Sequence, residues 1–401
     1  MKILLLGNGF DLYHKFPTRY DNFLHTVDFL QQCFDEEKTR TIGDVFGDVR
    51  LKETDSFIPT CYEAYKDVYD IMEIDTLKVK RLLSFAQHNM WFNYFLLSYN
   101  KELGWIDFEK EITKVLHAFN NFFLKCDKGS VFIAPDDAID KYIINCFDFF
   151  YGEKPIVTDN PGLYPTIKRT LIFDKYILEQ PFGSKIFIID KNKIINELYK
   201  ALLELAEMLK LYLDVFVNTP IEKLLENGFI SQTPIFDNMD RVITFNYTNT
   251  YEKIYTTQKI HHIHGNLIDR IIIGVNPDAS DEPNIDKYVD TAFLQFKKYY
   301  QRVLNGSDLG YLKLIKRLNE NKTSLMHQLT ELYVAGHSLN VTDKDIIKEV
   351  FSLVDKIMIV CHSTTAIADS INNLVGIYGK SNFDELRART DLEFKLYSDF
   401  E

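Results

Sequence analysis

Short apolar runs, each ending in a glycine or a polar turn and followed by a helical pattern, occur at both ends of the chain. They cover residues 2–6, 241–246, 259–265, 270–276, 331–336 and 356–363. Runs of this length that lead through a turn into a helix are typical of buried parallel strands. The sequence therefore predicts an α/β protein with a parallel, Rossmann-like sheet flanked by helices.

The middle of the chain has a different pattern, with long aromatic and charged stretches over residues 35–237. Apolar residues recur there every three or four positions, which is typical of amphipathic helices. We predict a mostly helical insertion over 35–237. The flanking segments, 1–34 and 238–401, are predicted to form one α/β nucleotide-binding domain together.

Composition excludes several classes of protein. The formal net charge of −12 argues against nucleic-acid binding by bulk electrostatics, because counterion release needs clustered lysine and arginine. Five cysteines without a C-x-x-C pair fit a reducing compartment and exclude a four-cysteine zinc site. No stretch approaches the ~18 apolar residues of a membrane span. We expect a cytoplasmic protein with no membrane or nucleic-acid partner.

Four turns follow the predicted strands, and parallel sheets bind ligands beyond the carboxyl ends of their strands. The turns are Gly7 to Asp11, Asn246 to Asn249, His264 to Asn266 and Gly336 to Ser338. We expect all four to face one crevice.

The first turn, GNGFD at residues 7–11, allows two interpretations. Glycines let backbone N–H groups approach a phosphate, and a following helix would present its positive end to it. Two glycines after a strand are also common in tight turns, and the full G-x-G-x-x-G fingerprint is not present. Asp11 either contacts ribose hydroxyls or orders the loop.

Three pairs of polar residues stand three positions apart, as in capping boxes at helix starts. They are Thr18 with Asp21, Asn249 with Glu252, and Thr342 with Asp345. Each pair predicts the beginning of a helix. Asn246, just before the second pair, either carries chemistry or only ends its strand.

The histidines of IHHIHG, residues 260–265, leave three interpretations open. In an extended strand His262 and His264 would point to the same face, as in an H-x-H metal pair. The usual additional ligands are missing, so we predict no metal and favour either an acid/base His264 or a buried structural histidine.

The acids Asp107, Glu109 and Glu111 follow one another closely. On a helix, Trp105, Phe108 and Ile112 would form the apolar stripe, which leaves the acids on the solvent side. We favour a solvated surface there, and a place at the mouth of the crevice is the alternative.

Several motifs occur in an order that resembles the bacteriophage abortive infection protein AbiH family over essentially the whole chain. They are NGFDLYHKFPTRYDNFL at 8–24, WIDFEKEI at 105–112, FNYTNTYEKIY at 245–255, IHHIHG at 260–265 and GHSLNVTDKDI at 336–346. The resemblance implies an antiphage effector of abortive infection, with a phage-derived trigger and self-assembly into a homo-oligomer.

A more distant similarity is to the sirtuin-like NAD-binding fold, and it implies a set of site residues. The Gly-Ala-Gly phosphate loop of that fold matches Gly7, Asn8 and Gly9, and the segment FPTRY, which carries Thr18 and Tyr20, echoes its Ile-Pro-Asp-Phe-Arg. Its catalytic asparagine matches Asn246, its His-Gly matches His264 and Gly265, and its late Gly-Thr-Ser-Leu turn matches Gly336, His337, Ser338 and Leu339.

Two positions depart from that pattern: Asp11 stands where sirtuins usually carry serine, and Thr248 stands where an aspartate commonly follows the asparagine. The zinc-ribbon cysteines of the deacylases are absent. What remains resembles sirtuin-like phage-defence effectors that cleave NAD+, which predicts catalysis by Asn246 and His264, NAD+ as substrate or ligand, and no tightly held cofactor.

Two rival functions stay open. In the first, the same pocket binds an adenine nucleotide without turnover, and the helical insertion senses a phage or host partner. The second, a nuclease or nucleotidase, would need a metal cluster and a basic stripe that the sequence does not show.

Overall fold

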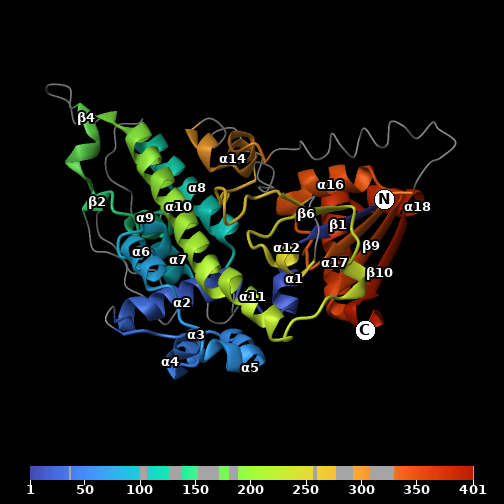
Figure 1. Cartoon of the computed structure of the whole chain (residues 1–401). Coiled ribbons are helices and arrows are strands. Elements are labelled where there is room, and N and C mark those ends of the chain that lie inside the picture. The colour runs from blue at the N-terminus through green and yellow to red at the C-terminus, as the bar shows by residue number, and fades with distance from the viewer. Residues whose placement is uncertain are drawn as a thin grey trace.

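The computed structural model of the chain describes residues 1–35, 38–99, 106–126, 138–151, 171–179, 188–255, 260–276, 292–307 and 329–400. A sheet with its covering helices lies at one end of the molecule, and a group of helices that includes the longest one lies at the other (Figure 1).

The sheet has six strands, all parallel to their neighbours. The strands are β1 (Lys2–Leu6), β6 (Arg241–Thr244), β7 (Ile260–His262), β8 (Glu331–Ala335), β9 (Lys356–Cys361) and β10 (Asp391–Leu396). Their order is β10-β9-β8-β1-β6-β7. Counted along the chain, this is the 3-2-1-4-5-6 order of doubly wound folds, so the strand order reverses between β1 and β8. The predicted α/β class with a parallel sheet is confirmed.

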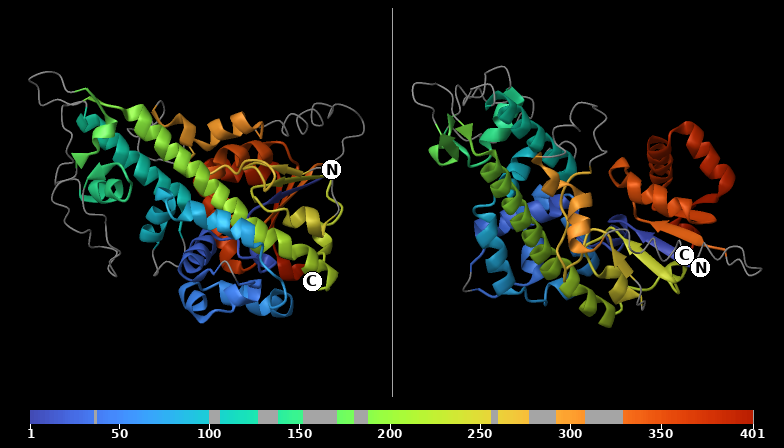
Figure 2. Two further views of the ribbon diagram at one scale, coloured as in Figure 1. Left: turned by 60° about the vertical axis from the view of Figure 1, so that its left-hand side comes forward. Right: turned by 90° about the horizontal axis from the view of Figure 1, so that it is seen from above.

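Both faces of the sheet are buried. Ile3 and Leu5 of β1 face a core that includes α16 (Lys344–Ser352), α17 (Thr364–Tyr378) and α18 (Lys380–Arg389). Leu4 and Leu6 face a second core that extends into the helical region. The view from above in Figure 2 shows the helical region beside the sheet. Burial on both sides explains why β1 is apolar at consecutive positions.

Residues 35–237 contribute mainly helices. They include α3 (Ile42–Phe46), α4 (Val49–Thr54), α5 (Ile58–Tyr69), α6 (Thr76–Ala86), α7 (Met90–Ser98), α8 (Phe108–Cys126), α9 (Ala138–Asn145), α10 (Lys191–Leu213) and α11 (Thr219–Glu226), with a π-helical turn at 214–218. Two short antiparallel pairs join β2 (Phe150–Tyr151) to β3 (Leu171–Ile172) and β4 (Ile177–Glu179) to β5 (Ile188–Ile189). The division of the chain into domains stays a prediction.

Three further helices belong to the connections that follow strands of the sheet: α1 (Gly9–Tyr13) follows β1, α12 (Thr250–Ile254) follows β6, and α14 (Lys298–Asn305) lies between β7 and β8 in the chain. The helix α2 (Tyr20–Cys33) leads from the first loop into the helical region. No helix within the described residues is long and apolar enough to cross a bilayer.

Two segments of the sheet region differ from the sequence prediction. Residues 270–276 form no strand, and Val275 makes only one parallel bridge, to Lys297. Conversely, β10 was not predicted, because its sequence DLEFKL alternates polar with apolar residues. It pairs with β9 at the edge of the sheet. One face of an edge strand can stay in contact with solvent, so every second residue there need not be apolar.

The loop after β1 and the turn after β8 touch backbone to backbone. The Gly7 N–H donates to Ala335 O at 3.1 Å, and the Gly9 N–H donates to Gly336 O at 2.7 Å. A Cβ atom on Gly336 would lie 2.0 Å from Phe10 N. Glycine is therefore required here because the two main chains pack against each other.

We expect Gly336→Ala to lower the free energy of unfolding by at least about 3 kcal/mol, because the new methyl group must displace the backbone of the first loop. Gly306→Ala is the matched control, since φ is +66° there and +65° at Gly336, but nothing lies within 4 Å of a Cβ on Gly306. The control should cost only about 1 kcal/mol. Urea unfolding measures both, and equal costs would contradict the loop contact.

Candidate functional site

A cavity of about 290 Å³ lies beyond the carboxyl ends of the strands, where the strand order reverses between β1 and β8. It is lined by most of the predicted site residues, namely Gly7, Asn8, Asp11, Thr18, Tyr20, Asn246, Thr248, His264, Gly336, His337 and Ser338. Gly9 and Gly265 are not among its lining. Gly9 packs against the backbone of Gly336 instead. Gly265 lies in a turn of the chain with φ +77°, where a Cβ atom would lie 1.9 Å from Arg270 O.

Asp11 is buried at the inner end of the cavity, with 1% of its surface exposed. The Thr248 hydroxyl donates to Asp11 Oδ2 at 2.6 Å, whereas Oδ1 has no hydrogen-bond partner among the described residues. Burial raises the pKa of Asp11 to about 6, against the opposing effect of the Thr248 hydrogen bond. The side chain is thus a carboxylate at neutral pH, with one oxygen free to meet a ligand.

Asn246 follows β6, and its backbone is held by a half-buried ion pair. The Asn246 carbonyl lies 3.0 Å from His262 Nδ1, and Glu252 Oε1 lies 2.5 Å from His262 Nε2. Both ring nitrogens face acceptors, so both must donate and His262 is an imidazolium. Burial alone would lower the pKa of His262, but the Glu252 carboxylate outweighs it and raises that pKa.

Although its side chain also hydrogen-bonds to Asp11, Asn246 keeps one side-chain atom available. Its Oδ1 is buried without a hydrogen-bond partner in the described part of the chain, and the residue is only 7% exposed. Native proteins satisfy almost all buried polar atoms, so an unsatisfied one that lines a cavity indicates a position for a ligand or for water. The amide is therefore placed to bind a reactant rather than only to end its strand.

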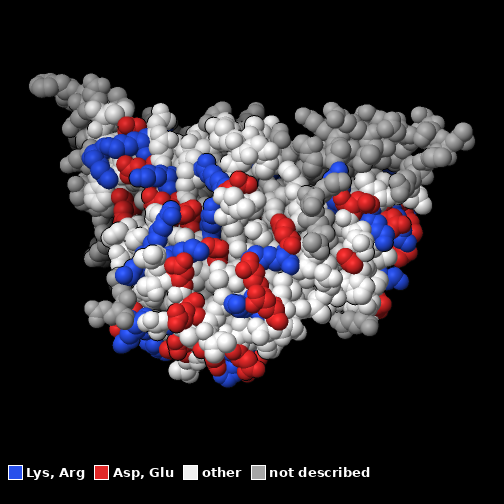
Figure 3. Space-filling view, in the orientation of Figure 1, with Lys and Arg blue, Asp and Glu red and all other residues white. Residues whose placement is uncertain are grey.

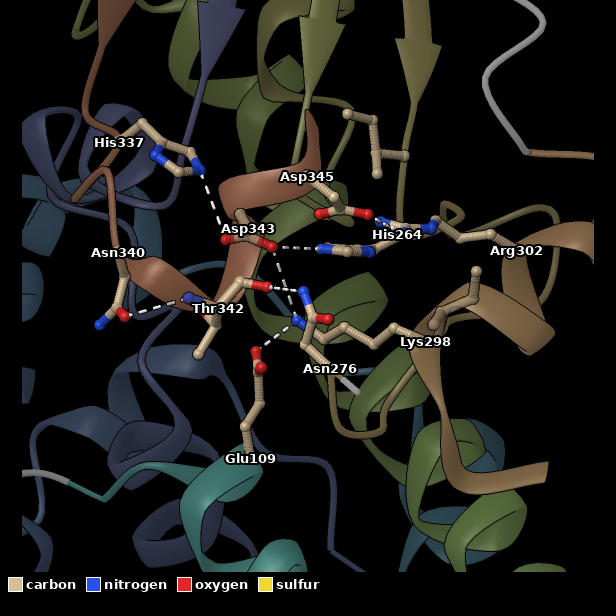
Figure 4. A network of polar contacts seen from close by, with 12 residues as sticks. Glu109, His264, Asn276, Lys298, Arg302, His337, Asn340, Thr342, Asp343 and Asp345 are labelled. Carbon is tan, nitrogen blue, oxygen red and sulfur yellow. Dashed lines mark hydrogen bonds and ion pairs between the residues drawn. The ribbon is translucent and has the colours of Figure 1, made fainter. Parts of the chain in front are cut away.

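His264 takes part in a network of charged groups at one side of the cavity (Figure 4). Its Nε2 lies 3.5 Å from Asp343 Oδ1, and Lys298 Nζ lies 3.9 Å from the same oxygen. Lys298 also forms an ion pair with Glu109 of α8. Burial and the nearby Lys298 charge lower the pKa of His264 to about 4, so the imidazole is neutral at physiological pH.

Asp343 lies between this network and His337. The Leu339 N–H donates to His337 Nδ1 at 2.9 Å, so the other nitrogen of the neutral ring carries the hydrogen, 3.6 Å from Asp343 Oδ2. Burial lowers the pKa of His337. Burial would raise the pKa of Asp343, but Lys298 and the two histidines hold that pKa well below its usual range.

The solvated surface predicted for the acids of residues 107–111 is wrong for two of them. Glu109 binds Lys298 and lines the cavity, and Glu111 is buried, with Tyr94 donating to it at 2.8 Å. Asp107 accepts from the Lys110 N–H at the start of α8 and also lines the cavity. Trp105 lies outside the described residues.

The sequence prediction missed Lys298, Asp343 and Tyr247 as lining residues. Lys298 lies in a charged stretch without a motif, and its partner Glu109 is 189 positions away in the sequence. Tyr247 lies within the motif FNYTNTYEKIY and Asp343 within GHSLNVTDKDI, so these motifs were the signal from which both lining residues could have been predicted.

The three predicted capping boxes are not formed. α2 begins at Tyr20 after Arg19, whose N–H donates to Asn22, and the Asn249 and Asp343 side chains make no capping bond. One residue of each predicted pair has a different role. Thr18 lines the cavity, Glu252 binds His262 and Asp345 binds Arg302 at 2.6 Å.

His262 and His264 do not form an H-x-H pair. β7 ends at His262, which binds Glu252, whereas His264 turns toward Asp343. Among the described residues, no group of three or more His, Cys, Asp or Glu side chains is arranged to hold a metal ion.

Comparison with known proteins identifies one family. Residues 3–362 match the family model described as "Bacteriophage abortive infection AbiH". No curated protein and no solved structure matches the chain.

We expect Asp11→Asn to raise the free energy of unfolding by about 3 kcal/mol at pH 8. The folded-state pKa of Asp11 is raised from 3.8 to about 6, so the ionised carboxylate destabilises the fold above pH 6, and this cost disappears as pH falls below 3.8. Asparagine still accepts from Thr248. The difference between wild type and variant should therefore shrink between pH 6 and pH 4.

Urea unfolding across pH 4 to 8 measures this difference. Asp67→Asn, at an exposed position of α5, is the control and should change stability by less than about 0.5 kcal/mol throughout. A constant difference between Asp11→Asn and wild type across the range would show that Asp11 does not titrate in this way.

Proposed function

The chain belongs to the bacteriophage abortive infection AbiH family, and from this premise we propose that it hydrolyses NAD+, releasing nicotinamide and depleting the NAD+ of the infected cell. NAD+ is the substrate in this proposal, not a tightly held cofactor. The resemblance to sirtuin-like defence effectors also leads us to propose a phage-derived trigger and self-assembly.

One observation carries the proposal: Asn246, His264 and Asp11 converge on a single cavity where the strand order of the sheet reverses. All three side chains have polar atoms without a hydrogen-bond partner among the described residues. Doubly wound folds bind nucleotides at this position of the sheet.

The two departures from the sirtuin pattern, which by themselves favour altered or lost turnover, lie together in the lining of the cavity. Asp11 stands in the place of a serine and Thr248 in the place of an aspartate, and these two residues are hydrogen-bonded to each other at 2.6 Å. The cavity thus holds a carboxylate and a hydroxyl in direct contact, and the carboxylate is the group that a cationic transition state would use.

The geometry suits cleavage of an N-glycosidic bond. The bond breaks through an oxocarbenium-like state, in which positive charge develops on the ribose. The Asp11 carboxylate would stabilise that charge, and the Asn246 amide would orient a ribose hydroxyl and the attacking water. Neutral His264 would accept the proton, and Asp343, 3.5 Å away, would stabilise the imidazolium as it forms.

Nicotinamide release from NAD+ tests the proposal, with purified protein alone and with an extract of phage-infected cells. We expect Asn246→Ala and His264→Ala each to lower the rate at least about 100-fold. Asn192→Ala and His88→Ala, at exposed positions, are matched controls and should keep the wild-type rate.

Full activity in both site variants would contradict the assignment of catalysis to Asn246 and His264. Tight nucleotide binding by wild type without nicotinamide release under any trigger would instead support a non-catalytic sensor.

An exchange experiment tests the role of the Asp11–Thr248 pair. We expect Asp11→Ser to lose at least about 90% of the activity, because the carboxylate is removed from the ribose position. The double variant Asp11→Ser/Thr248→Asp restores a carboxylate and a hydroxyl in contact and should recover activity above that of the single variant. Additive losses in the double variant would show that the pair does not act as a unit.

A further inference from the structure

The cavity carries an excess of negative charge. Four carboxylates line it, from Asp11, Asp107, Glu109 and Asp343, and among its described lining residues Lys298 is the only lysine or arginine. Lys298 is already paired with Glu109 and lies 3.9 Å from Asp343. The outer surface, by contrast, mixes both signs of charge on the face drawn in Figure 3.

The glycine turn offers few donors for a phosphate. The N–H groups of Gly7, Gly9 and Phe10 donate to Ala335 O, Gly336 O and Gly7 O respectively. Phosphate loops depend on such N–H groups being free to point at the ligand. A pyrophosphate would therefore gain little at this loop, and the carboxylates nearby would repel it.

The inner end of the cavity is built to hold a ligand. Asp11 and Asn246 are 1% and 7% exposed, and in both side chains Oδ1 has no hydrogen-bond partner among the described residues. The rim is different, because Asn8, Ser338 and Asn340 are exposed. A volume of about 290 Å³ is at the small end for ligand pockets. It fits half of a dinucleotide better than the whole.

We propose that the cavity recognises the positively charged N-ribosylpyridinium half of NAD+, and that the adenosine diphosphate half contributes little to binding. This inference rests on the proposed hydrolysis and names its substrate class: nicotinamide riboside is also a substrate. A cation that enters a poorly solvated, negatively charged cavity is strongly favoured over a neutral ring of the same shape.

The charge balance of the reaction agrees with this substrate class. Water adds to the anomeric carbon, the electron pair of the glycosidic bond moves to the ring nitrogen, and the proton of the water passes to His264. The ring leaves as neutral nicotinamide, so its attraction to the carboxylates is lost when the bond breaks. The positive charge passes to the ribose in the transition state, within reach of the same negative groups.

Two probes that differ only in charge test the inference by calorimetry. Nicotinamide riboside has a cationic ring, and its reduced dihydro form has a neutral ring of nearly the same shape. We expect the cationic form to bind at least tenfold more tightly than the reduced form and at least tenfold more tightly than ADP-ribose. Equal affinity for the two ring forms, or tighter binding of ADP-ribose, would overturn the inference.

Nicotinamide release separates this inference from the proposed function. We expect kcat/KM for nicotinamide riboside to lie within tenfold of that for NAD+. Release from NAD+ with a more than tenfold preference over the riboside would refute the inference and leave the hydrolase intact. Selective binding of the cationic riboside without release from any substrate would support the recognition and refute the hydrolase.

A charge-only substitution assigns the effect to the cavity. Asp107→Asn removes one carboxylate from the lining and keeps an oxygen that can accept from the Lys110 N–H. We expect it to weaken binding of nicotinamide riboside severalfold and to leave binding of the reduced form unchanged. Asp67→Asn on α5 should alter neither affinity. Equal weakening of both ring forms by Asp107→Asn would mean that the charge of Asp107 does not contribute to recognition of the cationic ring.

Discussion

The loop after β1 and the turn after β8 meet through their backbones, and the position of the cavity depends on that contact. Gly9 and Gly336 are the residues that permit it, with a hydrogen bond of 2.7 Å between them. Because the N–H groups of this loop are used to hold the turn, the loop positions side chains and supplies few donors of its own. Chemistry at this end of the sheet must come from side chains such as Asp11.

The charges around the cavity are held together by one lysine. Lys298 of α14 contacts Glu109 of α8 and Asp343 beside the turn after β8. A buried cation between two carboxylates lowers the cost of burying all three, whereas removal of one partner leaves an uncompensated charge. The helical region and the sheet thus contact each other through charged groups in the wall of the site.

The fold was largely predictable because strand periodicity is a local signal. β1, β6, β8 and β9 are apolar runs that lead into turns, and the structure contains them. β10 was missed because an edge strand such as DLEFKL needs no continuous apolar run, and residues 270–276 were misassigned because an apolar run can be buried without pairing.

The candidate site was predictable only where a motif marked it. Thr18, Glu252 and Asp345 have the spacing of helix caps, but each contacts a distant part of the chain or lines the cavity instead. Local spacing cannot distinguish these roles, because a tertiary partner leaves no trace in the neighbouring residues. Local rules that fail around one cavity are the pattern expected of a functional site.

Asp11 bears on the choice between turnover and simple sensing. Its ionised form destabilises the fold, since burial raises its pKa to about 6. A sensor of an adenine nucleotide could use this carboxylate to accept from a ribose hydroxyl, but the buried negative charge would also repel the phosphates. An enzyme that passes through a cationic transition state gains from it directly, since the attraction is greatest when positive charge reaches the ribose. The energetic cost of burying Asp11 is therefore better explained by hydrolysis than by binding alone.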